Sequence, residues 1–141
     1  MHHIYIKKYL TTYIFIPGGY WRKIGCFKDN KYSRALPFYL AVIDLDYDTT
    51  YPDLKKFFQV CRKLAERHGF YYFGIQAHYE CWAGYKRTRY DEYGSSNDCR
   101  VGNDGYGVGF ESANFVYGRA QAGLIFRLLG HFQSTRIISI I

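Results

Sequence analysis

The sequence lacks several features that mark common classes of protein. No stretch of about 18 residues is free of charged side chains, so we expect no membrane-spanning helix in this chain. There is no internal repeat, no low-complexity run and no Cys-x-x-Cys pair, and the missing pair argues against a structural zinc site. Aromatic residues, in contrast, make up 21% of the 141 residues, and hydrophobic residues make up 48%. This composition predicts one folded domain rather than a disordered chain.

The net charge of the chain comes from its two ends. Nineteen Lys and Arg against twelve Asp and Glu give a formal net charge of +7. All twelve acidic residues lie between Asp29 and Glu111, and residues 26–118 also contain twelve basic residues, so this middle segment is neutral. The remaining seven bases are spread over about fifty residues and form no dense patch of the kind that binds nucleic acid.

The neutral middle segment also contains all four cysteines and most of the glycines. We therefore predict a domain over residues 24–118, a basic N-terminal flank over residues 1–23, and a basic, apolar C-terminal flank over residues 119–141. Four apolar residues of the C-terminal flank have helical spacing: Leu124, Ile125, Leu128 and Leu129. This spacing indicates either an amphipathic helix or chain that does not belong to the domain.

One helix is the strongest local prediction. Seven side chains follow the spacing of a single helix face: Leu54, Phe57, Phe58, Cys61, Leu64, Ala65 and His68. Thr50 is a candidate cap, Asp53 complements the positive end of the helix dipole, and Gly69 provides a left-handed stop. Cys61 is therefore expected to point into the core.

Strands are predicted directly after this helix. Residues 70–76 are aromatic and β-favouring, and a tight connection at residues 77–79 leads to a second short strand around residues 80–82. A further strand is predicted over residues 113–117, while residues 44–50 and 94–109 have the composition of loops. One central helix packed on a small antiparallel sheet, with irregular loops, is an α+β fold.

The four cysteines allow three pairings, and the sequence alone does not choose among them. A mid-helix Cys61 that faces a strand Cys81 has suitable geometry for a disulfide between helix and sheet. Cys26 and Cys99 would then form the other disulfide and join the start of the domain to its late loop. The alternative is four reduced, buried thiols in a cytosolic protein.

Several short pieces of the sequence resemble the WSC domain and related apple-like (PAN-like) extracellular modules. They are GCFKD at residues 25–29, RALP at 34–37, GFYYFGIQ at 69–76, ECWAG at 80–84, YDEYG at 90–94, and NFVY at 114–117, together with Cys61 and Cys99. Their order and spacing cover about two thirds of the chain. The resemblance implies an extracellular, disulfide-bonded α+β module that binds carbohydrate, without catalytic residues and without a cofactor.

The sequence also departs from the WSC pattern. WSC domains usually contain more cysteines, and Ala83 stands where the family has the second Cys of a Cys-x-Cys-Gly turn. At least one disulfide of the family is therefore absent, and the resemblance supports the fold more strongly than the ligand. Neither flank is covered by the resemblance.

Aromatic residues are the best candidates for a binding site, because sugar rings stack on flat aromatic faces while polar side chains bind the hydroxyls. The candidate ligand-binding residues lie near the turn after the second strand: Tyr79, Trp82, Tyr85, Arg87, Tyr90, Asp91 and Tyr93, with Arg89 and Asn97 as further polar partners. The alternative is that Trp82 and several of these tyrosines pack in the core, with their polar atoms reaching the surface.

Two other motifs are weaker. Alternate carboxylates at residues 44–48 suggest calcium, but Thr49 and Lys55 stand where an EF-hand loop needs Gly and Glu, so we expect a solvated acidic loop and no metal. The glycine-rich residues 102–109 suggest a phosphate-binding loop, but no helix pattern follows them. We interpret this segment as a flexible loop.

We expect no enzymatic activity. The candidate nucleophile–base pairs are Cys81 with His78 and Cys61 with His68, neither pair has an orienting third group, and disulfides would consume both thiols. The sequence therefore predicts a non-catalytic extracellular binding module for a glycan or for a matrix or receptor protein. The alternative is a small intracellular basic protein that binds nucleic acid through its flanks.

The expected location is extracellular, or the ectodomain of a membrane protein. Disulfides need an oxidising compartment, but the apolar run Ile14–Phe15–Ile16 is too brief for the core of a secretory signal. We therefore expect the chain to be part of a larger ectodomain or to have a misassigned start.

Overall fold

A computed structural model describes residues 12–15, 20–43, 53–120, 124–127 and 136–138. The chain divides into two compact units. We call residues 1–20 and 120–141 the terminal unit, and Trp21–Arg119 the cysteine-bridged unit. No helix in the described part of the chain has the length and apolar character needed to cross a membrane.

The described part of the terminal unit is a three-stranded antiparallel sheet. Its order is β1 (Thr12–Phe15), β9 (Leu124–Arg127) and β10 (Arg136–Ile138). The helical interpretation of the C-terminal flank is therefore wrong for residues 124–127. These residues pair with strands on both sides, as when Ile125 lies opposite both Ile14 and Ile137, so pairing outweighs the helical spacing.

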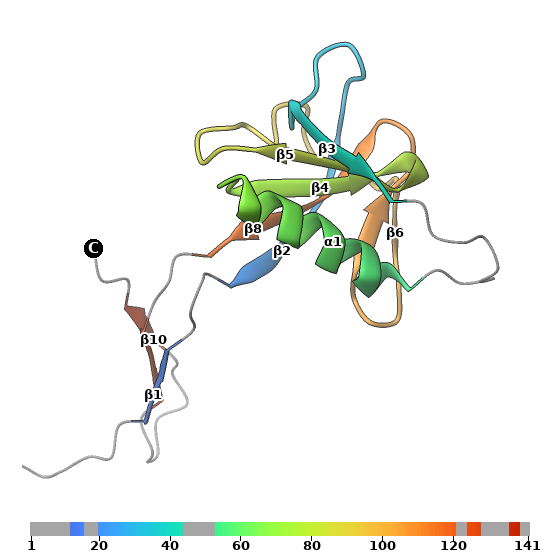
Figure 1. Cartoon of the computed structure of the whole chain (residues 1–141). Helices are drawn as coiled ribbons and strands as arrows, with labels where there is room; N and C mark the ends of the chain where they lie inside the picture. Colours follow the sequence, from blue (N-terminus) through green and yellow to red (C-terminus); the bar gives the residue numbers. More distant parts are fainter. Residues whose placement is uncertain (1–11, 16–19, 44–52, 121–123, 128–135, 139–141) are drawn as a thin grey trace, which may run out of the picture. The chain divides into compact units, whose positions relative to one another are not determined.

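The cysteine-bridged unit is built on a five-stranded antiparallel sheet (Figure 1). The spatial order is β2 (Trp21–Lys28), β8 (Ala113–Arg119), β4 (Tyr72–Gln76), β5 (Glu80–Gly84) and β3 (Phe38–Val42). A short 3-10 helix, η1 (Ala77–Tyr79), connects β4 to β5. The sequence did not predict β2 or β3, and the predicted boundaries at residues 24 and 118 fall inside β2 and β8.

The helix α1 (Leu54–Arg67) confirms the periodicity prediction. Asp53 is the N-cap, and its side chain accepts a hydrogen bond from the backbone N–H of Lys55 at 3.1 Å. The sequence had predicted Thr50 as the cap, and Thr50 lies outside the described residues. At the other end Gly69 has a φ of +72°, and its N–H donates to the carbonyl of Glu66. This left-handed residue ends the helix, as predicted.

The helix packs on one face of the sheet, which we call the helix face. Strands alternate their side chains between two faces, and the residues on this face are Phe73, Ile75, Cys81, Ala83, Phe115 and Tyr117. The ring centre of Phe73 lies 4.8 Å from that of Trp21 and 4.9 Å from that of Tyr117. The ring centres of Phe58, from α1, and Tyr117 are also 4.9 Å apart. These buried aromatic side chains form the core.

Both predicted disulfides are present. Cys61 of α1 bonds to Cys81 of β5 with a Cα–Cα distance of 5.7 Å, so it joins the helix to the sheet. Cys26 of β2 bonds to Cys99 with a Cα–Cα distance of 6.0 Å. No cysteine is free, which confirms the disulfide-bonded α+β fold and contradicts the alternative of four reduced thiols.

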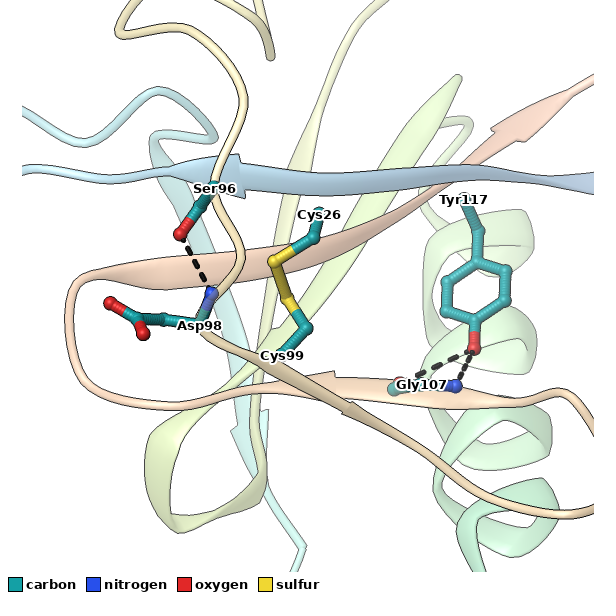
Figure 2. The surroundings of a disulfide bond; sticks show 6 residues. All are labelled: Cys26, Ser96, Asp98, Cys99, Gly107 and Tyr117. Carbon is teal, nitrogen blue, oxygen red and sulfur yellow. Dashed lines mark hydrogen bonds between the residues drawn. A yellow bond between two sulfur atoms is a disulfide. The ribbon is translucent and has the colours of Figure 1, made fainter.

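The segment predicted to be a loop over residues 94–109 contains a hairpin. Its strands are β6 (Cys99–Val101) and β7 (Gly107–Gly109). The glycines that suggested a loop have a steric function, because a Cβ on Gly109 would overlap the carbonyl of Ala113. Figure 2 shows the two links that hold this hairpin on the sheet, the Cys26–Cys99 disulfide and the hydrogen bonds between the Tyr117 hydroxyl and the backbone of Gly107.

Candidate functional site

The opposite face of the sheet is covered by loops, and we call it the loop face. Its strand residues include Gly74, Gln76, Glu80, Trp82 and Asn114. Leu36, from the segment between β2 and β3, is 1% exposed, and a Cβ on Gly74 would lie only 2.7 Å from its Cδ1 atom. Glycine at position 74 therefore leaves room for the Leu36 side chain against β4.

A network of polar side chains begins at the edge of this cover. The side chain of Asp29, which is fully buried, accepts hydrogen bonds from Nη1 of Arg34 at 2.7 Å and from the backbone N–H of Ala35 at 2.9 Å. Two acceptor bonds and an adjacent guanidinium compensate for the desolvation of this carboxylate. Asp29 therefore fixes both the Arg34 side chain and the start of the segment that carries Leu36.

The network continues onto two strands. Nη1 of Arg34 also donates to Oε1 of Gln76 at 3.2 Å, and Nε2 of Gln76 donates to Oε2 of Glu80 at 3.1 Å. The indole Nε1 of Trp82 donates to the same Oε2 at 2.9 Å, and the guanidinium of Arg34 lies 4.6 Å from the Trp82 ring centre. Arg34, Gln76, Glu80 and Trp82 are therefore held in defined positions by one another.

Two side chains of this network, Glu80 and Arg34, each keep a polar atom that can bind a ligand. Neither Oε1 of Glu80 nor Nη2 of Arg34 takes part in a hydrogen bond among the residues that the structure describes. A carboxylate oxygen can only accept and a guanidinium N–H can only donate. The two groups together therefore offer a fixed acceptor and a fixed donor.

A pocket of about 610 Å³, which we call the polar pocket, lies over these groups. Six charged residues line it, with three bases balancing three acids: Lys28, Lys31, Arg34, Asp29, Glu80 and Glu111. Tyr32, which is 86% exposed, and Tyr93 also line it. The Tyr93 hydroxyl donates to the carbonyl of Ser33 at 2.6 Å, so this ring is held at the wall of the pocket.

The structure brings two of the sequence-predicted aromatic residues to this site. Trp82 belongs to the network, and Tyr93 lines the polar pocket. Tyr79 instead stacks on Phe57 of α1, with ring centres 4.1 Å apart and an interplanar angle of 5°. Its position matches the alternative prediction, in which a tyrosine of this group packs in the core.

The other predicted residues lie at different places. Tyr85 packs on Phe38 and Phe70, with ring centres 5.1 Å and 4.7 Å away. Tyr90 packs on Phe27 and Tyr72 at 5.1 Å and 4.8 Å. The polar candidates in the loop after β5 are exposed: Arg87, Arg89, Asp91 and Asn97. The nine residues therefore do not form one continuous platform.

One tyrosine on each face of the sheet, Tyr117 on the helix face and Tyr72 on the loop face, has a raised pKa. Burial raises the pKa of the Tyr117 hydroxyl far above its ordinary value, and the hydrogen bond from the Gly107 backbone opposes this only in part. Burial, with the neighbouring Tyr90 and Tyr71, also raises the pKa of Tyr72. These residues thus act as neutral packing groups at physiological pH.

Four network residues were missed as a site by sequence reasoning: Asp29, Arg34, Gln76 and Glu80. Gln76 and Glu80 both point to the loop face because the register places them opposite each other in β4 and β5. A sequence signal did exist, since both are polar ends of apolar strands. This signal is weak, because the closeness of Gln76 and Glu80 becomes evident only when the pairing of β4 with β5 is known.

The other motifs provide no alternative site in the described residues. The acidic run at residues 44–48 lies outside them. The glycine-rich residues 102–109 contain β7 and the turn of a hairpin, not a loop that leads into a helix. Both candidate nucleophiles, Cys61 and Cys81, are consumed by one disulfide.

No protein-family model matches this chain, and no curated protein matches it either.

Proposed function

We propose that the cysteine-bridged unit is a non-catalytic extracellular binding module of the WSC-like or apple-like kind, and that it binds a saccharide in the polar pocket. The observation that carries this proposal is a pair of groups held by the network, Oε1 of Glu80 and Nη2 of Arg34, which make no hydrogen bond to any residue that the structure describes. The resemblance of the short sequence motifs to WSC domains supports the same ligand class.

The chemistry of a sugar fits this pair of groups. A sugar hydroxyl both donates and accepts, so one hydroxyl of a neighbouring pair can donate to the Glu80 carboxylate while the other accepts from the Arg34 guanidinium. Hydrogen bonds to charged partners contribute about 1.5–3 kcal/mol each to stability. Because the network already holds both side chains, little side-chain entropy is lost when the ligand binds.

The walls of the polar pocket complement such a ligand. Tyr32 and Tyr93 offer flat apolar faces to the C–H groups of a sugar ring, and the rest of the lining is largely polar, which suits the hydroxyls of a sugar. The balance of three bases and three acids gives the pocket no net charge to attract a strongly anionic ligand. We therefore propose an uncharged saccharide, and a protein ligand is the alternative within the same class of function.

The proposed location rests on the two disulfides. Disulfides persist in oxidising compartments and are rare in the cytosol. An extracellular protein, or the ectodomain of a membrane protein, meets this condition. The intracellular nucleic-acid alternative depends on the basic flanks, which lie largely outside the described residues.

The test is a glycan array probed with the wild-type chain, Glu80→Gln and Tyr85→Ala. Glu80→Gln removes the charge but keeps the size of the side chain, and we expect it to lower binding at least about tenfold, the loss of one charge-assisted hydrogen bond. Tyr85→Ala is the control, because Tyr85 is exposed and lines neither the polar pocket nor its network. Equal binding by Glu80→Gln and wild type, or no glycan bound by the wild type, would contradict the proposal.

A further inference from the structure

A second pocket adjoins the polar pocket. It has a volume of about 630 Å³, and Ala77 and Glu111 line both pockets. The two cavities therefore meet at a common rim formed by the start of η1 and by the turn between β7 and β8. Either pocket lies within the size range of a small-molecule site, so together they have room for a ligand longer than one sugar ring.

The second pocket differs in chemistry from the first. Its lining is largely apolar, with Tyr79, Val108 and Phe110, and its charged residues are Asp98, Arg100 and the shared Glu111. Phe110 is 55% exposed, although it is among the largest apolar side chains of the unit. An exposed aromatic ring beside a pocket is a suitable surface for the C–H face of a sugar.

Two residues with an unusual backbone conformation line the two pockets. Among the described residues, two that are not glycine have φ in the left-handed region, Tyr79 at +58° and Ser112 at +59°. Tyr79 lines the second pocket and Ser112 lines the polar pocket. Strained residues of this kind are held by their surroundings and cluster at ligand-binding sites.

The contacts that hold these two residues also define the rim. The carbonyl of Tyr79 accepts from the N–H of Ile43, and the carbonyl of Ser112 accepts from the N–H of Asp29 at 2.8 Å. The N–H of Ala113 donates to the carbonyl of Phe110, which closes the turn that carries Glu111. Glu111 is therefore presented between the two pockets by a strained turn anchored to the polar network.

We infer that the two pockets form one binding cleft for an uncharged oligosaccharide of at least two rings, with one ring in the polar pocket and the next on Phe110. This inference rests on the proposed saccharide function and extends it. The cleft is electrically balanced, with four bases against four acids: Lys28, Lys31, Arg34 and Arg100 against Asp29, Glu80, Asp98 and Glu111. A sulfated or uronic-acid chain would gain no net electrostatic attraction from such a surface.

The test is calorimetric titration of the full chain with neutral gluco- and manno-oligosaccharides of one to six rings, and with a heparin tetrasaccharide as the anionic probe. We expect the affinity for the neutral series to rise at least about tenfold between one ring and three, which corresponds to about 1.4 kcal/mol, and then to level off once Phe110 is covered. Phe110→Ala should remove this rise and leave the affinity for one ring within about twofold of wild type.

Tyr85→Ala is the matched control, since Tyr85 is 51% exposed and lies in neither pocket. Thermal unfolding of each variant checks that it is folded. Affinity that does not depend on length, or Phe110→Ala that keeps the full rise, would overturn the two-pocket cleft and leave the proposed function standing. Binding of heparin in preference to every neutral chain would overturn the assigned ligand class. If no sugar of any length binds, the proposed function fails and the inference fails with it.

Discussion

The two faces of the five-stranded sheet serve different purposes, although they share the same strands. The helix face is apolar and is closed by α1 and the Cys61–Cys81 disulfide. The loop face carries the side chains of Gln76, Glu80 and Trp82 in a hydrogen-bonded network beside a pocket. Alternation along β4 and β5 thus separates the residues that stabilise the fold from those that we propose bind a ligand.

Position in the sequence does not show whether an aromatic residue packs in the core or lies at the candidate site. Tyr79 and Trp82 are three residues apart, yet Tyr79 stacks on the helix residue Phe57 and Trp82 belongs to the loop face. A tyrosine or tryptophan near a turn is therefore not a ligand-binding residue by virtue of that turn. The side chains that it contacts in the folded protein decide its role.

The largest effect is expected on the helix face. Phe73 is completely buried and contacts Trp21, Phe58 and Tyr117. Phe73→Ala should lower the free energy of unfolding by about 3–5 kcal/mol, since it removes a buried ring and leaves a cavity. Urea denaturation measures this, with Tyr85→Ala as the exposed aromatic control. Losses of similar size in the two variants would contradict the division between core and surface rings.

A smaller effect is expected at the start of the loop-face network. Asp29→Ala removes the acceptor of the Ala35 backbone N–H and one of the two acceptors of Nη1 of Arg34. We expect a loss of about 2 kcal/mol in the free energy of unfolding, because donors deprived of a partner retain their desolvation cost. Glu80→Gln keeps a side-chain oxygen that can accept from Gln76 and Trp82, so it should lose less than about 1 kcal/mol under the same denaturation.

If Asp29→Ala proved as stable as wild type, the Asp29–Arg34 pair would not hold the network in place. If Glu80→Gln were instead destabilised as much as Phe73→Ala, Glu80 would belong to the core, and the loop face would lose its separate role.

The third effect is a pH dependence that belongs to the helix face. Burial raises the pKa of Tyr117 in the folded state above its unfolded value of about 10. The folded chain therefore holds this proton more tightly, so the free energy of unfolding should fall as the pH rises above about 10. The slope from this group is at most about 1.4 kcal/mol per pH unit.

Denaturation between pH 8 and pH 11 measures this dependence, and Tyr117→Phe is the matched variant because it keeps the ring and removes the titrating hydroxyl. Its stability should fall less steeply above pH 10. The same slope in both proteins would show that the Tyr117 hydroxyl titrates as it does in water.

Much of the helix face was predictable from the sequence. The spacing of Leu54, Phe57, Cys61 and Ala65 encodes both the helix and the side that it buries. A buried Cys61 made Cys81 a suitable partner, although the sequence alone left three pairings open. Helix signals are local, because contacting positions lie three or four residues apart. The left-handed stop at Gly69 was predictable for the same reason.

The loop face could not be predicted in the same way, because its contacts join distant segments. Arg34 and Gln76 are 42 residues apart, and nothing in either local pattern indicates that they meet. The strands β6 and β7 were hidden by glycines that are required for close packing, as at Gly107 and Gly109. Pairing between short, glycine-rich strands is set by tertiary contacts rather than by local propensity.

The measurement that tests the division of the two faces most directly is an NMR titration of the ¹⁵N-labelled chain with the best-binding neutral oligosaccharide. We predict that the amide shifts change most at Gln76, Ala77, Glu80, Phe110 and Glu111, which border the two pockets. Amides of α1 should change little. Shift changes that cluster on α1, or around Phe38 and Tyr85, would contradict the account and place the ligand on another surface.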